Sequence, residues 1–156
     1  AGGFGIAGAA GALAAPLAGA LADRTGPARV TQLGSALVII SFALMFTLPL
    51  LSPHWQLVLI AISAVGFDFG LQASLVSHQT LVYSLEPAAR GRLNALLFTV
   101  VFVGMALGSV LGAQAWALAG WSAVTGLATL VAVIALSIRL LDAARVSRAA
   151  SLARQS

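Results

Sequence analysis

Asp68 is the one acidic residue inside the long apolar stretches of this sequence. Measured as helix from Trp55, it lies about 20 Å along the axis, near the middle or in the inner half of a bilayer. A charge at that depth costs at least ~2.5–3.5 kcal/mol, so we expect the carboxyl group to face the protein interior or a water-filled cavity. Two interpretations remain open: a carboxylate that couples protons or orients a substrate, and a structural acid that a polar neighbour holds or burial keeps protonated.

Gln72, His78 and Gln79 follow Asp68 on the same apolar stretch. The two glutamines are spaced so that they share the helix face of Asp68, and the three side chains form a polar stripe. The glutamines either line a cavity and hydrogen-bond a polar substrate, or they bond to neighbouring helices at about 0.6 kcal/mol each. His78 is either a proton relay or a partly hydrated side chain near the end of the helix.

The residue types that enzymes and metal sites need are scarce in this sequence. There is no cysteine, which excludes disulfides and thiolate metal ligands. The two histidines, His54 and His78, lie far apart, and three of the four acids fall outside the apolar stretches. There is no Gly-x-Ser-x-Gly elbow and no phosphate-binding loop. The sequence therefore predicts neither an enzyme nor a metal or cofactor site.

The composition is that of a protein embedded in lipid. Of the 156 residues, 60% are hydrophobic and 8% are charged, whereas a soluble domain carries about a quarter charged residues. The net charge of +4 is small and the arginines do not cluster on one polar face, which argues against nucleic-acid binding. The sequence opens at Ala1 without a charged leader, so we interpret the chain as part of a longer protein.

Charged and turn-forming residues divide the chain into five apolar stretches, each about long enough to cross a bilayer as helix. The runs are too long and too continuous for the alternating strands of a membrane barrel. We therefore predict an all-α, polytopic transmembrane bundle with five spans. The predicted spans are residues 2–22, 30–50, 55–85, 93–117 and 121–141, followed by a polar, basic tail over residues 142–156.

All eight basic residues are arginine, and all fall on one side of this arrangement. They lie in the loops after the first and third spans and at or beyond the end of the fifth: Arg24, Arg29, Arg90, Arg92, Arg139, Arg145, Arg148 and Arg154. Positive loops face the cytoplasm, and interfacial tryptophans mark membrane boundaries. Trp55, Trp116 and Trp121 lie at the opposite side. Both patterns predict a multi-pass protein of the inner (plasma) membrane with a cytoplasmic C-terminus.

The loop after the first span reads Gly19-Ala-Leu-Ala-Asp23-Arg24-Thr-Gly26-Pro-Ala-Arg29. It resembles the signature loop of the major facilitator superfamily, which occurs between helices 2 and 3 and again between helices 8 and 9. In this reading Gly19 permits a close helix contact and Gly26 a tight turn. Asp23 is expected to bind the positive end of a neighbouring helix, and the arginines to bridge to acids. The loop would act in conformational switching.

Two further segments strengthen this resemblance. The loop with Glu86, Arg90, Arg92 and Asn94 is similar to the one between helices 10 and 11 of bacterial sugar and drug efflux members, and Asn94 is expected to cap or anchor the next helix. A glycine ladder follows, made of Gly104, Gly108 and Gly112. Such ladders let another backbone approach closely. The resemblance implies that the spans are helices 8 to 12, in the C-terminal half.

The resemblance implies a secondary active transporter in which two six-helix halves enclose a substrate path and rock against each other. It implies proton-driven antiport for the efflux of small organic molecules, with Asp68, Gln72, His78 and Gln79 on the pathway. The expected partners are the lipid bilayer, the missing N-terminal half of the same transporter and a small-molecule substrate, but no nucleic acid. The alternative is a non-transporting membrane scaffold or sensor module whose helices only pack.

Overall fold

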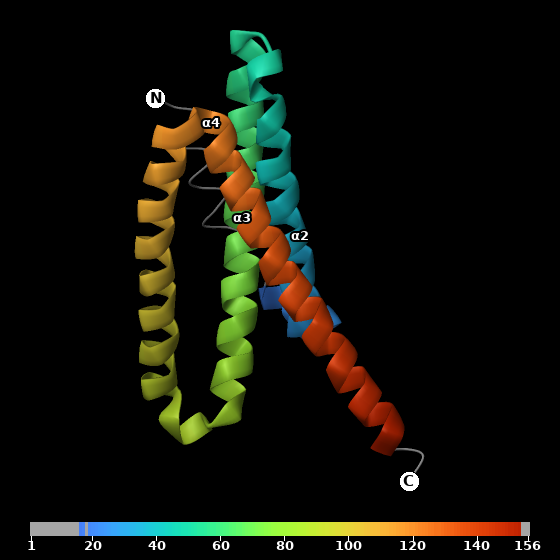
Figure 1. The fold of residues 1–156 in the computed structure, drawn as a ribbon. Coiled ribbons are helices and arrows are strands. Elements are labelled where there is room, and N and C mark those ends of the chain that lie inside the picture. The colour runs from blue at the N-terminus through green and yellow to red at the C-terminus, as the bar shows by residue number, and fades with distance from the viewer. Residues whose placement is uncertain (1–15, 18, 154–156) are drawn as a thin grey trace.

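The computed structural model describes residues 16–17 and 19–153, and this part of the chain is helical without strands (Figure 1). Residues 19–25 are helical and precede α2 (Pro27–Leu44), which continues as the 3₁₀ helix η1 (Met45–Leu50). After a short turn come α3 (Pro53–Leu85), η2 (Pro87–Ala89) and α4 (Arg90–Ala153). Most of the span predicted over residues 2–22 lies outside the described residues.

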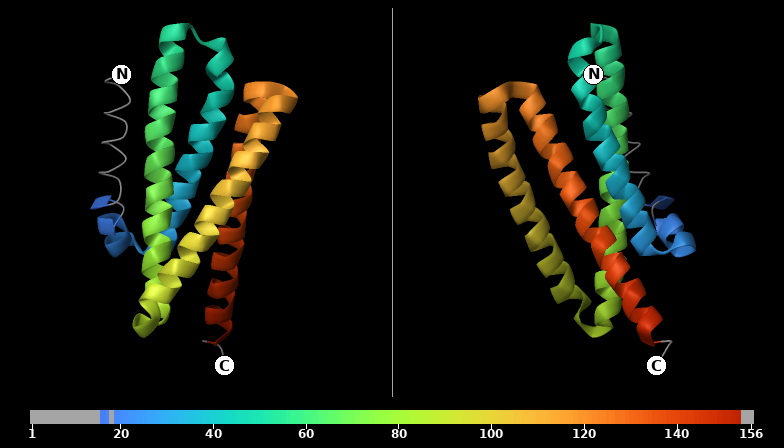
Figure 2. Two further views of the ribbon diagram at one scale, coloured as in Figure 1. Left: turned by 90° about the vertical axis from the view of Figure 1, so that its left-hand side faces the viewer. Right: turned by 45° about the vertical axis from the view of Figure 1, so that its right-hand side comes forward.

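α4 is two helices rather than one, because its backbone leaves the helical region at Ala119 and Gly120. Gly120 has a φ of 63° and a ψ of −144°, a conformation that only glycine reaches without strain. Figure 2 shows the two arms lying antiparallel on either side of this turn. We refer to residues 90–118 as the first arm and to residues 121–153 as the second arm. The second arm stays helical to Ala153, well past residue 142, where the sequence predicted the polar tail to begin.

Within the described residues, three helices are long and apolar enough to cross a membrane: Pro27–Leu50, Pro53–Leu85 and Arg90–Arg148. The third of these includes both arms of α4, and the predicted spans 93–117 and 121–141 fall one on each arm. With 33 residues, α3 exceeds the roughly 20 residues that a bilayer core requires. A helix of this length either tilts or extends beyond the hydrocarbon.

Small side chains form the tightest interface, which lies between α2 and α3. A Cβ atom added at Gly34 would lie 2.6 Å from the carbonyl oxygen of Gly70, and one added at Gly70 would lie 2.5 Å from that of Gly34. Ala73 and Ser77 are buried on the same face of α3. Lipid offers no hydrophobic drive for helix association, so helices in a membrane gain contact by bringing backbones close together. Gly66 and Gly70 form a Gly-x-x-x-Gly motif of this kind, which the sequence analysis overlooked.

Large apolar side chains face outward, which reverses the pattern of a soluble protein. Leu33, Ile62, Leu107 and Leu130 are each about 60% exposed, and many similar residues lie around the bundle. The described residues bury hydroxyl groups and small side chains instead, among them Thr31. A lipid environment stabilises this arrangement, because apolar side chains facing hydrocarbon carry no hydration cost.

The hairpin between α3 and α4 is closed by a side-chain hydrogen bond. Tyr83, in the last turn of α3, donates its hydroxyl hydrogen to Oδ1 of Asn94, in the first turns of α4. In the loop itself, the backbone N–H of Ala89 donates to the carbonyl of Glu86 at 3.0 Å. This pair of bonds fixes where the first arm leaves α3.

Candidate functional site

Asp68 lies between Gly66 and Gly70, the two glycines that face α2. An α-helix turns by about 100° per residue, so the Asp68 side chain points about 200° away from Gly70, on the face of α3 opposite α2. Asp68 is half-buried, and it has no hydrogen-bond partner in the part of the chain described. The interpretation of Asp68 as an acid held by a polar neighbour therefore gains no support from residues 16–17 and 19–153. Its position leaves the carboxylate free to meet water, a proton or a ligand.

A pocket of about 560 Å³ opens between α3 and the first arm of α4. Its polar side chains, Gln72, Ser74 and His78, all come from α3. The first arm supplies an apolar wall that includes Phe98, Phe102 and Met105. We call this cavity the His78 pocket. It brings together two of the predicted site residues, Gln72 and His78, and adds an apolar wall that the sequence analysis did not identify.

The other two predicted pathway residues lie beside the His78 pocket rather than in its wall. Asp68 is one helical turn before Gln72 on the same face of α3. Gln79 follows His78 and is half-buried.

The apolar wall of the His78 pocket has a signal in the sequence. One face of the first arm carries Phe98, Phe102 and Met105, which are spaced by four and three residues. This helical spacing could have indicated the wall.

His78 is held in one orientation by its own helix. Its Nδ1 lies 2.7 Å from the carbonyl oxygen of Ser74, one turn earlier. A carbonyl oxygen only accepts hydrogen bonds, so Nδ1 carries the hydrogen atom and Nε2 of the neutral ring is an acceptor. The predicted proton relay would have to operate through Nε2.

The loop before α2 has one position that favours glycine, Gly26, and several exposed charges. Gly26 has a φ of 88°, and an L side chain there would be strained. Its backbone N–H donates to the carbonyl of Ala22 at 2.9 Å, which ends the preceding helical turn. Asp23, Arg24 and Arg29 are exposed, and no ion pair involves them within the described residues. The partners predicted for these charges would have to come from elsewhere in the polypeptide.

Two groups of predicted glycines do not make close contacts in this structure. A Cβ atom added at Gly19, Gly104, Gly108 or Gly112 meets no described atom within 4 Å. Gly108 and Gly112 instead border an apolar space of about 350 Å³ between the arms of α4 and the α2–α3 pair. Helix packing at the ladder stays a prediction that needs a neighbour outside the described residues.

The second cytoplasmic loop predicted from the sequence is compact and solvated. Glu86, Arg90 and Arg92 are exposed, and Glu86 and Arg92 both line a shallow pocket around η2. Asn94 is half-buried and accepts the hydrogen bond from Tyr83 described above. In the described part of the chain, no cluster of three or more His, Asp or Glu side chains is placed to hold a metal ion.

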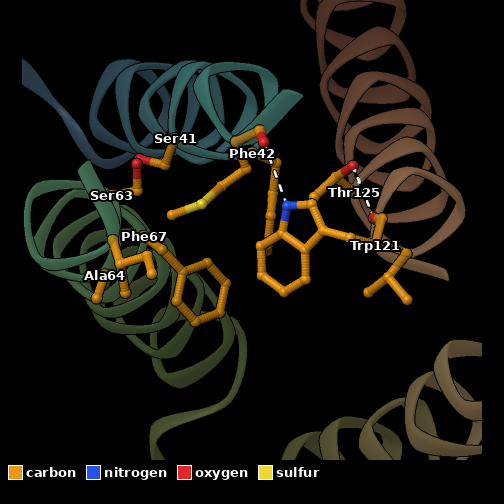
Figure 3. Close-up of a pocket in the computed structure, with 10 residues that line it drawn as sticks. Ser41, Phe42, Ser63, Ala64, Phe67, Trp121 and Thr125 are labelled. Atoms are coloured by element: carbon orange, nitrogen blue, oxygen red, sulfur yellow. Dashed lines mark hydrogen bonds between the residues drawn. The ribbon is translucent and has the colours of Figure 1, made fainter. Parts of the chain in front are cut away.

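A second, smaller pocket of about 200 Å³ lies where α2, α3 and the second arm meet (Figure 3). Phe42, Phe67 and Trp121 line it, and Figure 3 shows the Trp121 indole reaching from α4 toward the end of α2. The indole Nε1–H donates to the carbonyl oxygen of Met45 at 3.2 Å. Met45 is the first residue of the 3₁₀ helix η1, so this bond ties the second arm to the point where α2 continues as η1. We call this cavity the Trp121 pocket.

The Trp121 hydrogen bond leads to a first prediction. Trp121→Phe should lower the free energy of unfolding of the complete protein by about 1 kcal/mol, because hydrogen bonds between membrane helices contribute between about 0.6 and 1.7 kcal/mol. Thermal unfolding in detergent measures this difference. Trp55→Phe is the matched control, since Trp55 is 59% exposed and should leave stability unchanged. Equal effects of the two substitutions would show that the bond to Met45 contributes nothing.

The comparison with known families decides the identity of the chain. The family model of the Major Facilitator Superfamily matches residues 1–155. The chain belongs to this superfamily. The resemblance drawn from the loop at Gly19–Arg29 is thereby confirmed at the level of the superfamily, and the long apolar helices of the described residues fit a multi-pass membrane protein.

Two relatives of the chain carry the word transporter in their names. The chain is 34% identical over 107 residues to the "Uncharacterized transporter YgaY" of Escherichia coli, covering 69% of this chain and 26% of that protein. It is 35% identical over 125 residues to the "Probable transporter SCO4007" of Streptomyces coelicolor, covering 80% of this chain and 28% of that protein. The chain thus spans about a quarter of the length of these relatives. No solved structure matches it.

Proposed function

We propose that the chain forms helices 8 to 12, in the C-terminal half of a secondary active transporter that exports small organic molecules in exchange for protons. The observation that carries this proposal is the position of Asp68. It is an acid near the middle of a long apolar helix, on the face turned away from the tightly packed α2. Ionisable groups at membrane depth are costly, and they are found where ions, protons or substrates pass.

The arrangement of the helix ends supports the proposed orientation. The beginning of α2, the η2 loop and the end of α4 lie toward one end of the bundle, while η1 and the turn at Ala119–Gly120 lie toward the other (Figure 1). The first group of segments carries the arginines, so the positive-inside rule favours the cytoplasm for that end. The tryptophans, with exposed Trp55 and Trp116, belong to the opposite end.

The topology can be tested with single cysteines, because the sequence contains none. Ser52→Cys lies in the turn between η1 and α3, and Ala88→Cys lies in η2; both positions are exposed. In intact cells expressing the complete protein, with any cysteines elsewhere removed, a membrane-impermeant maleimide should label Ser52→Cys only. It should label Ala88→Cys only after the membrane is opened. Labelling of both positions from one side would contradict the proposed orientation.

Transport itself is tested with the complete protein in proteoliposomes. We expect an imposed pH gradient to drive movement of at least one compound from a panel of sugars and aromatic drugs, and dissipation of the gradient to stop it. Equal movement with and without the gradient would contradict proton coupling. Absence of protein-dependent movement for every compound would instead favour a scaffold or sensor role.

A further inference from the structure

We infer that the His78 pocket binds an aromatic amine, a molecule with a flat apolar body and an N–H group, rather than a sugar. This inference rests on the proposed transport function and names the substrate class of that site. It follows from the size of the pocket, from the chemistry of its two walls and from the hydrogen bond that orients the His78 ring.

The pocket has the dimensions and surface of a site for a drug-sized molecule. Its volume of about 560 Å³ falls inside the range of about 300 to 1,000 Å³ that is typical of small-molecule sites. Seven of its ten lining residues are apolar, and Phe98, Phe102 and Met105 stand on one wall. Aromatic rings and the polarisable thioether of methionine favour contact with another aromatic ring.

The opposite wall offers very few polar groups. The hydroxyl of Ser74 lies within 2.8 Å of the position that a Cβ atom on Gly34 would occupy, so Ser74 is turned toward α2. Its carbonyl oxygen already accepts from Nδ1 of His78. The groups left for a ligand are the amide of Gln72 and Nε2 of His78.

These two groups select the chemistry of the ligand. With Nδ1 donating to Ser74, Nε2 of the neutral ring is a hydrogen-bond acceptor and needs an N–H or O–H from the ligand. A sugar carries several hydroxyl groups, and most of them would lose their water without finding a partner here. An aromatic amine presents one such donor on an apolar body. Asp68, one turn before Gln72 on α3, adds a carboxyl group that accepts hydrogen bonds from an amine and so favours an amine over an acid.

The test measures equilibrium binding to the complete protein in detergent without any gradient. Ethidium serves as the aromatic probe with N–H donors, and tetraphenylphosphonium serves as an aromatic cation that has none. We expect both to bind saturably, with maltose unable to displace either. His78→Phe should weaken ethidium binding about tenfold through loss of the acceptor, and tetraphenylphosphonium binding by less than about twofold.

Matched variants separate the pocket from general effects. Phe102→Ala should weaken both probes about fivefold or more, whereas Phe46→Ala, at an exposed phenylalanine outside the pocket, should weaken neither. His54→Phe is the matched control for His78→Phe. His78→Gln keeps an acceptor oxygen, so ethidium binding should stay within about threefold of the original, which excludes misfolding as the cause of the loss.

The outcomes distinguish this inference from the proposed function. Failure of ethidium to bind, or binding that neither His78→Phe nor Phe102→Ala weakens, overturns the inference. Proton-driven movement of a sugar that all pocket variants leave unchanged also overturns it, while the transport proposal stands. The expected binding pattern without any gradient-driven movement supports the pocket and removes the transport proposal.

Discussion

Asp68→Asn is expected to reduce proton-driven transport by the complete protein by at least about tenfold while leaving the folded protein as stable as before. Asparagine has nearly the same shape as aspartate, but its amide cannot take up and release a proton near neutral pH. Because Asp68 points away from the α2 contact, the substitution touches no tightly packed atoms. An uncharged amide at membrane depth costs no more than the carboxyl group that it replaces, so stability should be unchanged or higher.

Two measurements together identify the role of Asp68. Flux in proteoliposomes under an imposed pH gradient reports coupling, and thermal unfolding in detergent reports stability. Asp142→Asn is the matched control, because Asp142 is exposed on the second arm and should leave both quantities unchanged. Full proton-dependent flux in Asp68→Asn would remove this residue from the mechanism. A large loss of stability would instead show that Asp68 is a structural acid.

Gly70→Ala is expected to destabilise the complete protein by about 1–3 kcal/mol. The added Cβ atom would lie 2.5 Å from the carbonyl oxygen of Gly34 and 2.8 Å from a methyl group of Val38. A backbone carbonyl within a helix has little freedom to move, so α2 and α3 must separate. Separation would also lose the contacts of buried Ala73 and Ser77.

Gly126→Ala provides the contrast for this prediction. Gly126 is also inside a helix, but a Cβ atom there would lie 3.6 Å from the ring of Phe46, an ordinary contact. Alanine favours a helix over glycine by about 1 kcal/mol, so Gly126→Ala should be neutral or stabilising. Thermal unfolding of the two variants should therefore give shifts of opposite sign or very different size. Similar shifts would show that α2 and α3 do not meet closely at Gly70.

The sequence predicts the helical, membrane-embedded class well, because lipid demands long apolar runs and complete backbone hydrogen bonding. The structure has a loop at Glu86 and a turn at Gly120, where charged and turn-forming residues separate the apolar stretches. The length of the last helix does not follow from the apolar stretch, because alanine, leucine and arginine favour helix in water as well as in lipid, and α4 continues to Ala153.

The contacts between helices were predicted less well. Both Gly66-x-x-x-Gly70 and the ladder at Gly104, Gly108 and Gly112 fit a close-packing motif, yet only the first meets a described neighbour. A Gly-x-x-x-Gly motif indicates that one helix face carries small residues, but it does not indicate which helix packs against that face. For the same reason, the sequence predicted only the polar wall of the His78 pocket, and the apolar wall was not predicted. Its polar wall comes from one helix, whereas Phe98 and Phe102 come from the next, across a turn whose angle the sequence does not give.

The hydrogen bond between Tyr83 and Asn94 has a mechanical consequence for the His78 pocket. It joins the last turn of α3 to the first turns of α4, whereas the two helices diverge with distance from η2 (Figure 2). Because α3 and the first arm are joined near η2, the space between them widens when their other ends move apart. A ligand would therefore leave the pocket on the side of the Ala119–Gly120 turn, which is the outer side in the proposed orientation. Gly120, which adopts conformations closed to other residues, joins the moving end of the first arm to the second arm and would let the first arm swing.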